Sequence, residues 1–199
     1  MAAQLLTVRQ LLDDVFWFDG LLALAVGSPA EPHVRYYTKD EEFDIDPDKD
    51  TFFGPAMRSA SGGKKDTVLG SAVLWVDADD PQRPLTTIPP SLIIRSGRGY
   101  HLYWILDKPL LDAPKLEVLN KLLAKDVPTA DKGAWNCNRV LRVPNTKNTK
   151  YDPPAAVEIV TSALDRIYNI DDFKILEILD SKTRHKIRTG DRRGYRSRS

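Results

Sequence analysis

The chain has 199 residues, of which 42% are hydrophobic and 9% aromatic. This length suits one domain, or one domain with a short appendage, and the apolar content excludes a wholly disordered chain. The single cysteine excludes an intramolecular disulfide framework, and with only three histidines present we also exclude a Cys/His zinc cluster. The longest apolar run, 21–26, is too short to span a bilayer, and residues 1–20 show no secretion signal. We therefore expect a cytoplasmic protein that does not contact a membrane.

Charge is divided unevenly along the chain. The formal net charge is +1, from 29 basic and 28 acidic residues. Residues 182–199 hold eight of the basic residues and one acid, so this segment carries +7 and residues 1–181 carry −6. We expect 1–181 to form the folded domain and 182–199 a basic, disordered tail that binds the phosphates of a polyanion, with Arg188, Arg192 and Arg193 among the contacts. A solvated tail without a partner is the alternative.

Hydrophobic periodicity and turn residues predict an alternation of strands and helices. Thr7 can cap the first helix and Gly20 can break it. In chain order, the pattern predicts a helix over 5–25, strands over 34–38 and 51–53, an acidic surface loop over 39–50, a basic loop over 59–65, strands over 72–77, 92–95 and 100–106, a helix over 113–125, strands over 140–143 and 156–161, and a helix over 171–179. This order is typical of an α+β domain with one mixed or antiparallel sheet flanked by helices.

Two acids end the strand predicted over 72–77. Side chains alternate along an extended strand, so Asp77 and Asp79 point to the same side, about 7 Å apart. Such a pair repels and is costly to desolvate unless a cation lies between the carboxylates. Oxygen ligands in a chain with few histidines favour Mg²⁺ or Mn²⁺ over zinc. A strand that runs out into a solvated acidic turn is the alternative.

A glycine-rich turn separates the next two strands. The sequence Ser96-Gly97-Arg98-Gly99 between two apolar runs predicts a tight hairpin. The glycines allow backbone N–H groups to approach an anion, and Arg98 offers a forked donor. His101 follows the turn, and a histidine among large apolar neighbours is usually a core residue. Its place beside the turn and near the acid pair favours a phosphate contact.

A third polar cluster lies over 139–150. Arg139 and Arg142 are an odd number of residues apart, so on one strand they would face opposite ways. Beyond Pro144, asparagine, threonine and lysine side chains follow at close spacing, which suits a polyphosphate. An ordinary polar loop with solvated lysines is the alternative.

In this order and spacing, the three clusters resemble the motifs of the archaeo-eukaryotic primase superfamily, and in particular those of phage and plasmid primase-polymerases. Residues 74–79 resemble the family's apolar strand that ends in Asp-x-Asp. Residues 96–104 resemble its Ser-x-His hairpin, with Arg98 as the one substitution. Residues 140–150 resemble its third motif, with Asn145 in place of the usual glycine.

The resemblance implies an RRM-like catalytic core and a template-dependent nucleotidyltransferase, a DNA primase or DNA polymerase or both, that uses two Mg²⁺ or Mn²⁺ ions. It also implies a phage- or plasmid-encoded protein in a prokaryotic cytoplasm. The implied partners are a single-stranded DNA template, an NTP or dNTP, and a helicase domain or protein. The implied residues are Asp77, Asp79 and His101 for catalysis; Asp77, Asp79 and Asp131 for the metals; and Ser96, Arg98, His101, Arg142, Asn148 and Lys150 for the nucleotide.

One position departs from the family pattern. Related phage primases often carry a third acid where this chain has Asn136. Those primases also carry another acid about five residues earlier, a position matched here by Asp131, so the resemblance implies that Asp131 takes the third place. The amide oxygen of Asn136 can coordinate a metal but carries no charge. A weak second metal or an inactive site is the alternative, and a non-catalytic nucleic-acid-binding module of the same fold is therefore our second hypothesis. A metal-dependent nuclease is a third, which the triphosphate-recognition hairpin disfavours.

Overall fold

The computed structural model describes residues 7–27 and 32–181. The predicted tail contacts Arg188, Arg192 and Arg193 lie outside these residues. No helix in the described part of the chain is long and apolar enough to cross a membrane.

The N-terminal helix is shorter than the sequence predicts. Thr7 and Gln10 form a capping box at the start of α1 (Val8–Leu11), and the chain continues as one π-helical turn, η1 (Leu12–Phe16). The predicted helix over 5–25 is wrong beyond this point. The chain turns at Gly20, where φ is 74°, and enters strand β1 (Leu22–Val26), whose first four residues are buried. Uninterrupted apolar runs suit a strand covered on both faces as well as they suit a helix.

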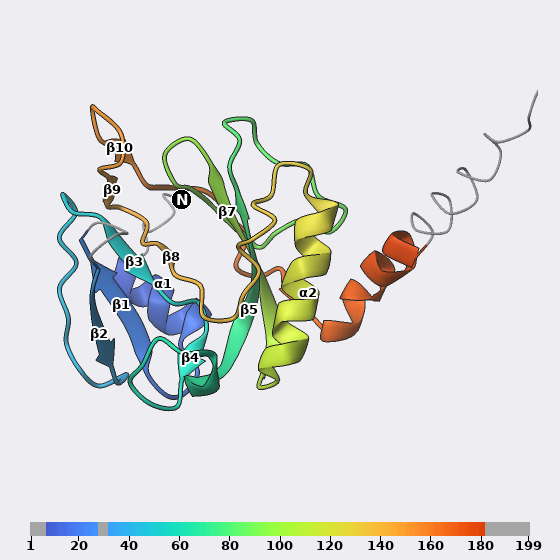
Figure 1. Ribbon diagram of the computed structural model, residues 1–199, viewed down its shortest axis with the longest axis horizontal. Coiled ribbons are helices and arrows are strands. Elements are labelled where there is room, and N and C mark those ends of the chain that lie inside the picture. The colour runs from blue at the N-terminus through green and yellow to red at the C-terminus, as the bar shows by residue number, and fades with distance from the viewer. Residues whose placement is uncertain (1–6, 28–31, 182–199) are drawn as a thin grey trace, which may run out of the picture.

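Two large sheets organise the described residues, with a third, two-stranded sheet β10-β9 beside them, in place of the single sheet predicted (Figure 1). The smaller sheet is antiparallel, in the order β2-β1-β3-β8, and the larger runs β11-β6-β7-β5-β4, with β12 added parallel to β7. Beyond β1, the strands are β2 (His33–Tyr37), β3 (Thr51–Phe53), β4 (Met57–Arg58), β5 (Val68–Ala78), β6 (Leu92–Arg95), β7 (Tyr100–Leu110), β8 (Leu141–Arg142), β9 (Lys147–Asn148), β10 (Ala155–Ala156), β11 (Glu158–Ser162) and β12 (Ile167–Tyr168).

The larger sheet is covered on both faces (Figure 1). Helix α2 (Ala113–Asp126) lies along β5, where the side chain of Asn120 accepts a 3.0 Å hydrogen bond from the Trp75 backbone. On the opposite face, Phe16 joins the two sheets through edge-on contacts, at 5.1 Å from the Tyr103 ring and 4.7 Å from the Phe53 ring. The two sheets therefore share one core on the Tyr103 face of β7.

The remaining elements refine the predicted ones. A short turn, η2 (Lys65–Thr67), precedes β5, and η3 (Ile170–Phe173) leads into helical residues 174–181. The strand predicted over 156–161 is divided between β10 and β11. The polar segment before it contains β9, which pairs with β10, so the end of the third motif lies in a hairpin.

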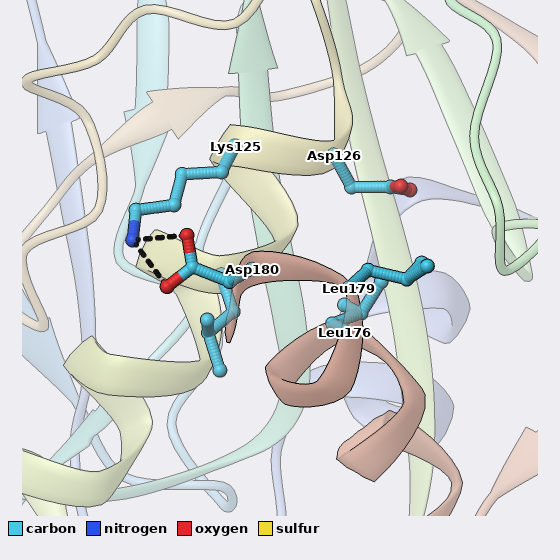
Figure 2. Close-up of a pocket in the computed structure, with 6 residues that line it drawn as sticks. Lys125, Asp126, Leu176, Leu179 and Asp180 are labelled. Atoms are coloured by element: carbon cyan, nitrogen blue, oxygen red, sulfur yellow. Dashed lines mark hydrogen bonds and ion pairs between the residues drawn. The ribbon is translucent and has the colours of Figure 1, made fainter. Parts of the chain in front are cut away.

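A groove lies between α2 and helical residues 174–181 (Figure 2). Its volume is about 370 Å³, and Leu122, Asp126 and Leu176 are among the residues that line it. Lys125 Nζ lies 3.0 Å from each carboxylate oxygen of Asp180 and links the two helices.

Candidate active site

Strand pairing places Asp77 directly opposite His101. The two residues are register partners on the antiparallel strands β5 and β7, and directly opposed residues carry their side chains on the same face. Trp75 and Tyr103 form the next pair on this face, which is the face that meets the smaller sheet. The predicted hairpin between β6 and β7 is confirmed, with Arg95 opposite Tyr100. The carboxylate and the imidazole thus lie between the two sheets.

A third acid joins the pair through backbone hydrogen bonds at the end of β5. The Asp131 amide donates to the Asp77 carbonyl at 2.7 Å, and the Asp79 amide donates to the Thr129 carbonyl at 3.0 Å. This short pairing brings Asp131 beside Asp77, although 54 residues separate them in the sequence. Asp79 lies one residue beyond the end of β5 and is exposed.

Arg139 lies between two of these carboxylates. Its Nη2 atom is 2.9 Å from Asp77 Oδ2 and 3.3 Å from Asp131 Oδ2. Arg139 belongs to the third polar cluster of the sequence, which predicts no role for it. The prediction that Arg139 and Arg142 face opposite ways is wrong, because both line one cavity with Asp77 and His101. Arg139 precedes β8, in a turn where its amide donates to the Asn136 carbonyl, so strand alternation does not apply to it.

The cavity opens between the sheets and has a volume of about 240 Å³. Phe52 on β3 and Arg142 on β8 line it from the smaller sheet, and Asp77 on β5 and His101 on β7 line it from the larger. The Arg142 guanidinium stacks on the Phe52 ring at 4.7 Å. A cavity with two guanidinium groups, a carboxylate and an imidazole among apolar lining residues suits an anionic ligand.

Burial and charge shift the protonation of the site. His101 is only 3% exposed, and burial lowers its pKa to about 4, with Asp77 opposing the shift and the two arginines adding to it. The imidazole is therefore neutral at pH 7. Its Nε2 lies 3.7 Å from Asp77 Oδ1, and its Nδ1 has no hydrogen-bond partner among the described residues.

The pKa of Asp79 is raised. Although the residue as a whole is exposed, partial desolvation of its carboxyl group is the largest cause, and the negative charges of Asp77 and Asp131 follow, partly offset by Lys150 and Arg139. Both other carboxylates are therefore close enough to repel the ionised form of Asp79. A divalent cation would relieve this repulsion, which is the arrangement expected of a magnesium or manganese site.

The three carboxylates have the chemistry of such a site without its closed geometry. In residues 7–27 and 32–181, no group of three or more His, Cys, Asp or Glu side chains is gathered closely enough to hold a metal ion. Arg139 already bridges two of the candidate ligands. Asn136 has a buried Oδ1 without a hydrogen-bond partner among the described residues, while its side-chain nitrogen donates to Asn138 Oδ1 at 3.0 Å. Carboxylate oxygens are ligands that suit Mg²⁺ or Mn²⁺, and in this structure the Arg139 guanidinium binds two of these carboxylates.

The glycine-rich turn and the third motif lie against each other. The side-chain amide of Asn148 donates a hydrogen bond to the Ser96 carbonyl at 2.6 Å. The backbone amide of Ser96 donates to the Gly99 carbonyl at 2.9 Å. Gly97 has φ 112°, and a side chain there would meet Asn148 and Tyr151. Four of the predicted nucleotide-binding residues, Ser96, Arg98, Asn148 and Lys150, are thus brought into one loop cluster.

These four residues differ in exposure. Arg98 and Lys150 are exposed, whereas Ser96 and Asn148 are buried. The Arg98 guanidinium lies 4.7 Å from the Tyr151 ring, which supports it at the surface. The Asn148 side chain donates to the Ser96 carbonyl through its nitrogen and accepts from the Lys150 backbone amide through its oxygen. These hydrogen bonds hold the two loops together.

Asp50 is a site residue that the sequence analysis missed. The prediction placed it at the end of a surface loop, and residues 44, 46 and 48 are indeed exposed, but Asp50 is 4% exposed. Its Oδ1 accepts from Arg142 Nε at 3.1 Å, and its Oδ2 accepts from both the amide and the hydroxyl of Thr149. No local pattern reveals this role, because both partners are more than 90 residues away.

The α+β domain, in which the strand that ends in Asp77-Ala78-Asp79 pairs with the hairpin that carries His101, shares its fold with solved primase domains. The primase-polymerase domain of cyanophage S-2L superposes with a TM-score of 0.63 at 13% sequence identity, over 83% of this chain and 93% of that one.

Two structures of primase RepB' share the fold. One has a TM-score of 0.55 at 11% identity, and this chain covers 65% of it. The other is the catalytic domain in complex with initiator DNA, with a TM-score of 0.53 at 12% identity, over 94% of this chain and 96% of that one. Neither a known protein family nor a curated protein matches the sequence. The predicted fold class is therefore confirmed, and the roles of the individual residues stay predictions.

Proposed function

We propose that this chain is the catalytic domain of a template-dependent nucleotidyltransferase, a DNA primase or DNA polymerase or both, that serves phage or plasmid replication. The observation that carries the proposal is the convergence of Asp77, Asp79, Asp131 and His101 at one end of β5, beside a cavity lined by Arg139 and Arg142. In-line phosphoryl transfer requires charge neutralisation and positioning more than a covalent catalyst, and this site offers both.

The carboxylates are the proposed metal ligands. Asp77, Asp79 and Asp131 would hold two Mg²⁺ or Mn²⁺ ions, whose chemistry is to neutralise the triphosphate and to lower the pKa of an attacking 3′-hydroxyl. The Asp131 backbone bond to Asp77 supports its assignment as the third ligand in place of Asn136.

The remaining site residues are proposed to bind the nucleotide. His101 is neutral and buried, so it can donate one N–H to a phosphate oxygen without bringing a charge. Arg142 on β8 provides a positive donor in the cavity, and Arg98 and Lys150 provide two more in the loop cluster. Ser96 and Asn148 hold the glycine turn in the conformation that presents its backbone N–H groups.

Single-stranded DNA is the proposed template. In the described part of the chain, a cationic aromatic surface lies near Arg139: Trp135, with Lys65 Nζ at 5.6 Å and Lys121 Nζ at 4.9 Å from its ring. Aromatic rings and lysines are the usual groups for unpaired bases and phosphates. The structure of RepB' with initiator DNA supports a nucleic-acid partner for this fold. The tail contacts at Arg188, Arg192 and Arg193 and the helicase partner stay predictions.

A primer-extension assay tests the proposal. The native chain, with a primed single-stranded template, Mn²⁺ or Mg²⁺ and dNTPs or NTPs, should incorporate nucleotides, and Asp77→Asn should not. Asp80→Asn is the matched control, because Asp80 is the next acid but its carboxylate accepts the Gln82 amide in a turn at 2.7 Å. An unlabelled template without primer in the same assay distinguishes priming from extension.

A non-catalytic DNA-binding module of the same fold is the second candidate. Asn136 and the guanidinium between Asp77 and Asp131 favour it, since both reduce the negative charge available to a metal. Retained DNA binding with no incorporation by the native chain under any of the metal and nucleotide conditions would establish this candidate and refute the enzyme.

A further inference from the structure

Arg139 is placed where a shared metal ion would be expected. A single nitrogen, Nη2, lies 2.9 Å from Asp77 Oδ2 and 3.3 Å from Asp131 Oδ2. Magnesium requires carboxylate oxygens at about 2.1 Å in a nearly octahedral shell. These two oxygens cannot hold both the guanidinium nitrogen and a bridging metal ion at the same point. Occupancy by Arg139 and occupancy by the ion exclude each other.

The rest of the arginine side chain is held loosely. Its Nε is buried without a hydrogen-bond partner among the described residues, and the side chain keeps 32% of its surface exposed. It also lines the 240 Å³ cavity together with His101 and Arg142. The guanidinium therefore has space to move toward a ligand in that cavity, and an unpaired donor that a ligand oxygen could satisfy.

Arg142 provides an internal contrast. It lines the same cavity, but its Nε is bound to the buried carboxylate of Asp50 and its guanidinium is stacked on Phe52. Asp50 is in turn fixed by Thr149. The partners of Arg142 are not candidate metal ligands, whereas both partners of Arg139 are.

From this geometry we infer that Arg139 is a built-in substitute cation. In the metal-free protein it holds Asp77 and Asp131 together, and it is transferred to the phosphates of the incoming nucleotide when a divalent ion takes its place. The inference rests on the proposed function, because it requires those carboxylates to be metal ligands. Its consequence is coupling: metal binding and nucleotide binding strengthen each other, since the nucleotide stabilises the arginine position that leaves the carboxylates free.

Manganese binding without nucleotide tests the exclusion directly. Free Mn²⁺ can be followed by electron paramagnetic resonance during titration of the native chain, Arg139→Met and Arg139→Gln. Removal of the bound guanidinium should tighten Mn²⁺ binding about tenfold, the effect of losing one competing charged hydrogen bond. Two different replacements guard against a fold defect in either one, and circular dichroism confirms that each is folded.

Lys150→Met is the matched control for loss of a nearby positive charge. Lys150 acts on Asp79 through its charge, and within the described residues it makes no ion pair with Asp77 or Asp131. Its removal should tighten Mn²⁺ binding less than about threefold. Equal gains in the lysine and arginine variants would mean that only the electrostatic field changed, and would overturn the inference.

A non-hydrolysable nucleoside triphosphate tests the coupling. After correction for Mn²⁺ bound by the nucleotide alone, the analogue should raise the Mn²⁺ affinity of the native chain and have a much smaller effect on Arg139→Met. Unchanged or weaker Mn²⁺ binding in both Arg139 variants overturns the inference and leaves the proposed enzyme intact. Absence of Mn²⁺ binding in every protein, with and without the analogue, overturns the proposed function as well.

Discussion

Two acid–arginine clusters face the same cavity, and they differ in how completely their charges are matched. Asp50 pairs with Arg142, and both of its carboxylate oxygens accept hydrogen bonds, so this buried cluster is balanced. The second cluster has three carboxylates, Asp77, Asp79 and Asp131, for the one guanidinium of Arg139. Its histidine is neutral and leaves Nδ1 without a partner among the described residues.

The difference indicates that the Asp50–Arg142 cluster stabilises the fold, whereas the cluster of Asp77, Asp79 and Asp131 is suited to bind a ligand. A buried carboxylate with every oxygen satisfied contributes to a fixed geometry, and breaking it exposes an uncompensated charge. A cluster with excess negative charge is costly to the free protein and becomes favourable when a cation arrives, which is typical of a binding site. We expect substitutions in the balanced cluster to reduce stability and substitutions in the unbalanced cluster to reduce function.

The largest effect should come from Asp77→Asn. It should reduce nucleotide incorporation by about a thousandfold or more, because a catalytic metal ion is worth several kcal/mol and 1.4 kcal/mol is a factor of ten. The free energy of unfolding should change by less than about 1 kcal/mol, since lost pairing with Arg139 is offset by lost repulsion. Primer extension and urea denaturation measure the two quantities. A large loss of stability would make Asp77 a structural residue.

Asp50→Asn should affect stability more than the substitution of Asp77 does. It should reduce the free energy of unfolding by about 3 kcal/mol, because it leaves the poorly exposed Arg142 without its counter-charge. Urea denaturation at neutral pH checks the loss. Asp48→Asn is the control, since the Asp48–Lys147 pair is exposed and should contribute less than about 1 kcal/mol. Equal small effects of the two substitutions would remove the distinction between a buried support and a surface pair.

His101→Ala should act on the nucleotide. We expect the nucleotide KM to rise about tenfold, the value of one lost hydrogen bond to a charged group, while the template Kd stays within about twofold. Steady-state extension and fluorescence anisotropy on the same folded sample give both numbers. Equal weakening of nucleotide and template would place His101 in the core rather than in the unbalanced cluster.

Asp79→Asn should give the smallest change in stability. The raised pKa of Asp79 means that its ionised form is less favourable in the folded than in the unfolded chain. In chelated buffer at pH 7 the variant should match the native chain or exceed it by up to about 0.5 kcal/mol. This advantage should disappear as the pH falls below the ordinary value of 3.8, where the carboxyl is protonated in both states. A clear destabilisation at pH 7 would contradict the account of repulsion.

The motifs and many of the local elements were predictable, because each depends on the pattern of a few neighbouring residues. β3 and β6 match the predicted ranges, and the glycine turn gave the hairpin that sets His101 opposite Asp77. The strand at 22–26 was not predictable, because a buried apolar run suits a helix equally well. The orientation of Arg139 depends on a turn just before β8, and the burial of Asp50 depends on a partner 92 residues away. Sequence periodicity carries neither of these long-range relations.

One diffraction experiment tests the unbalanced cluster most directly: crystals soaked with Mn²⁺ and a non-hydrolysable nucleoside triphosphate, with data collected at the manganese absorption edge. We predict an anomalous peak within coordinating distance of the Asp77 and Asp79 carboxylates, with Arg139 moved from these acids to the triphosphate. A fully occupied nucleotide with no peak at these carboxylates, and Arg139 still joining Asp77 to Asp131, would contradict the proposed metal-dependent site.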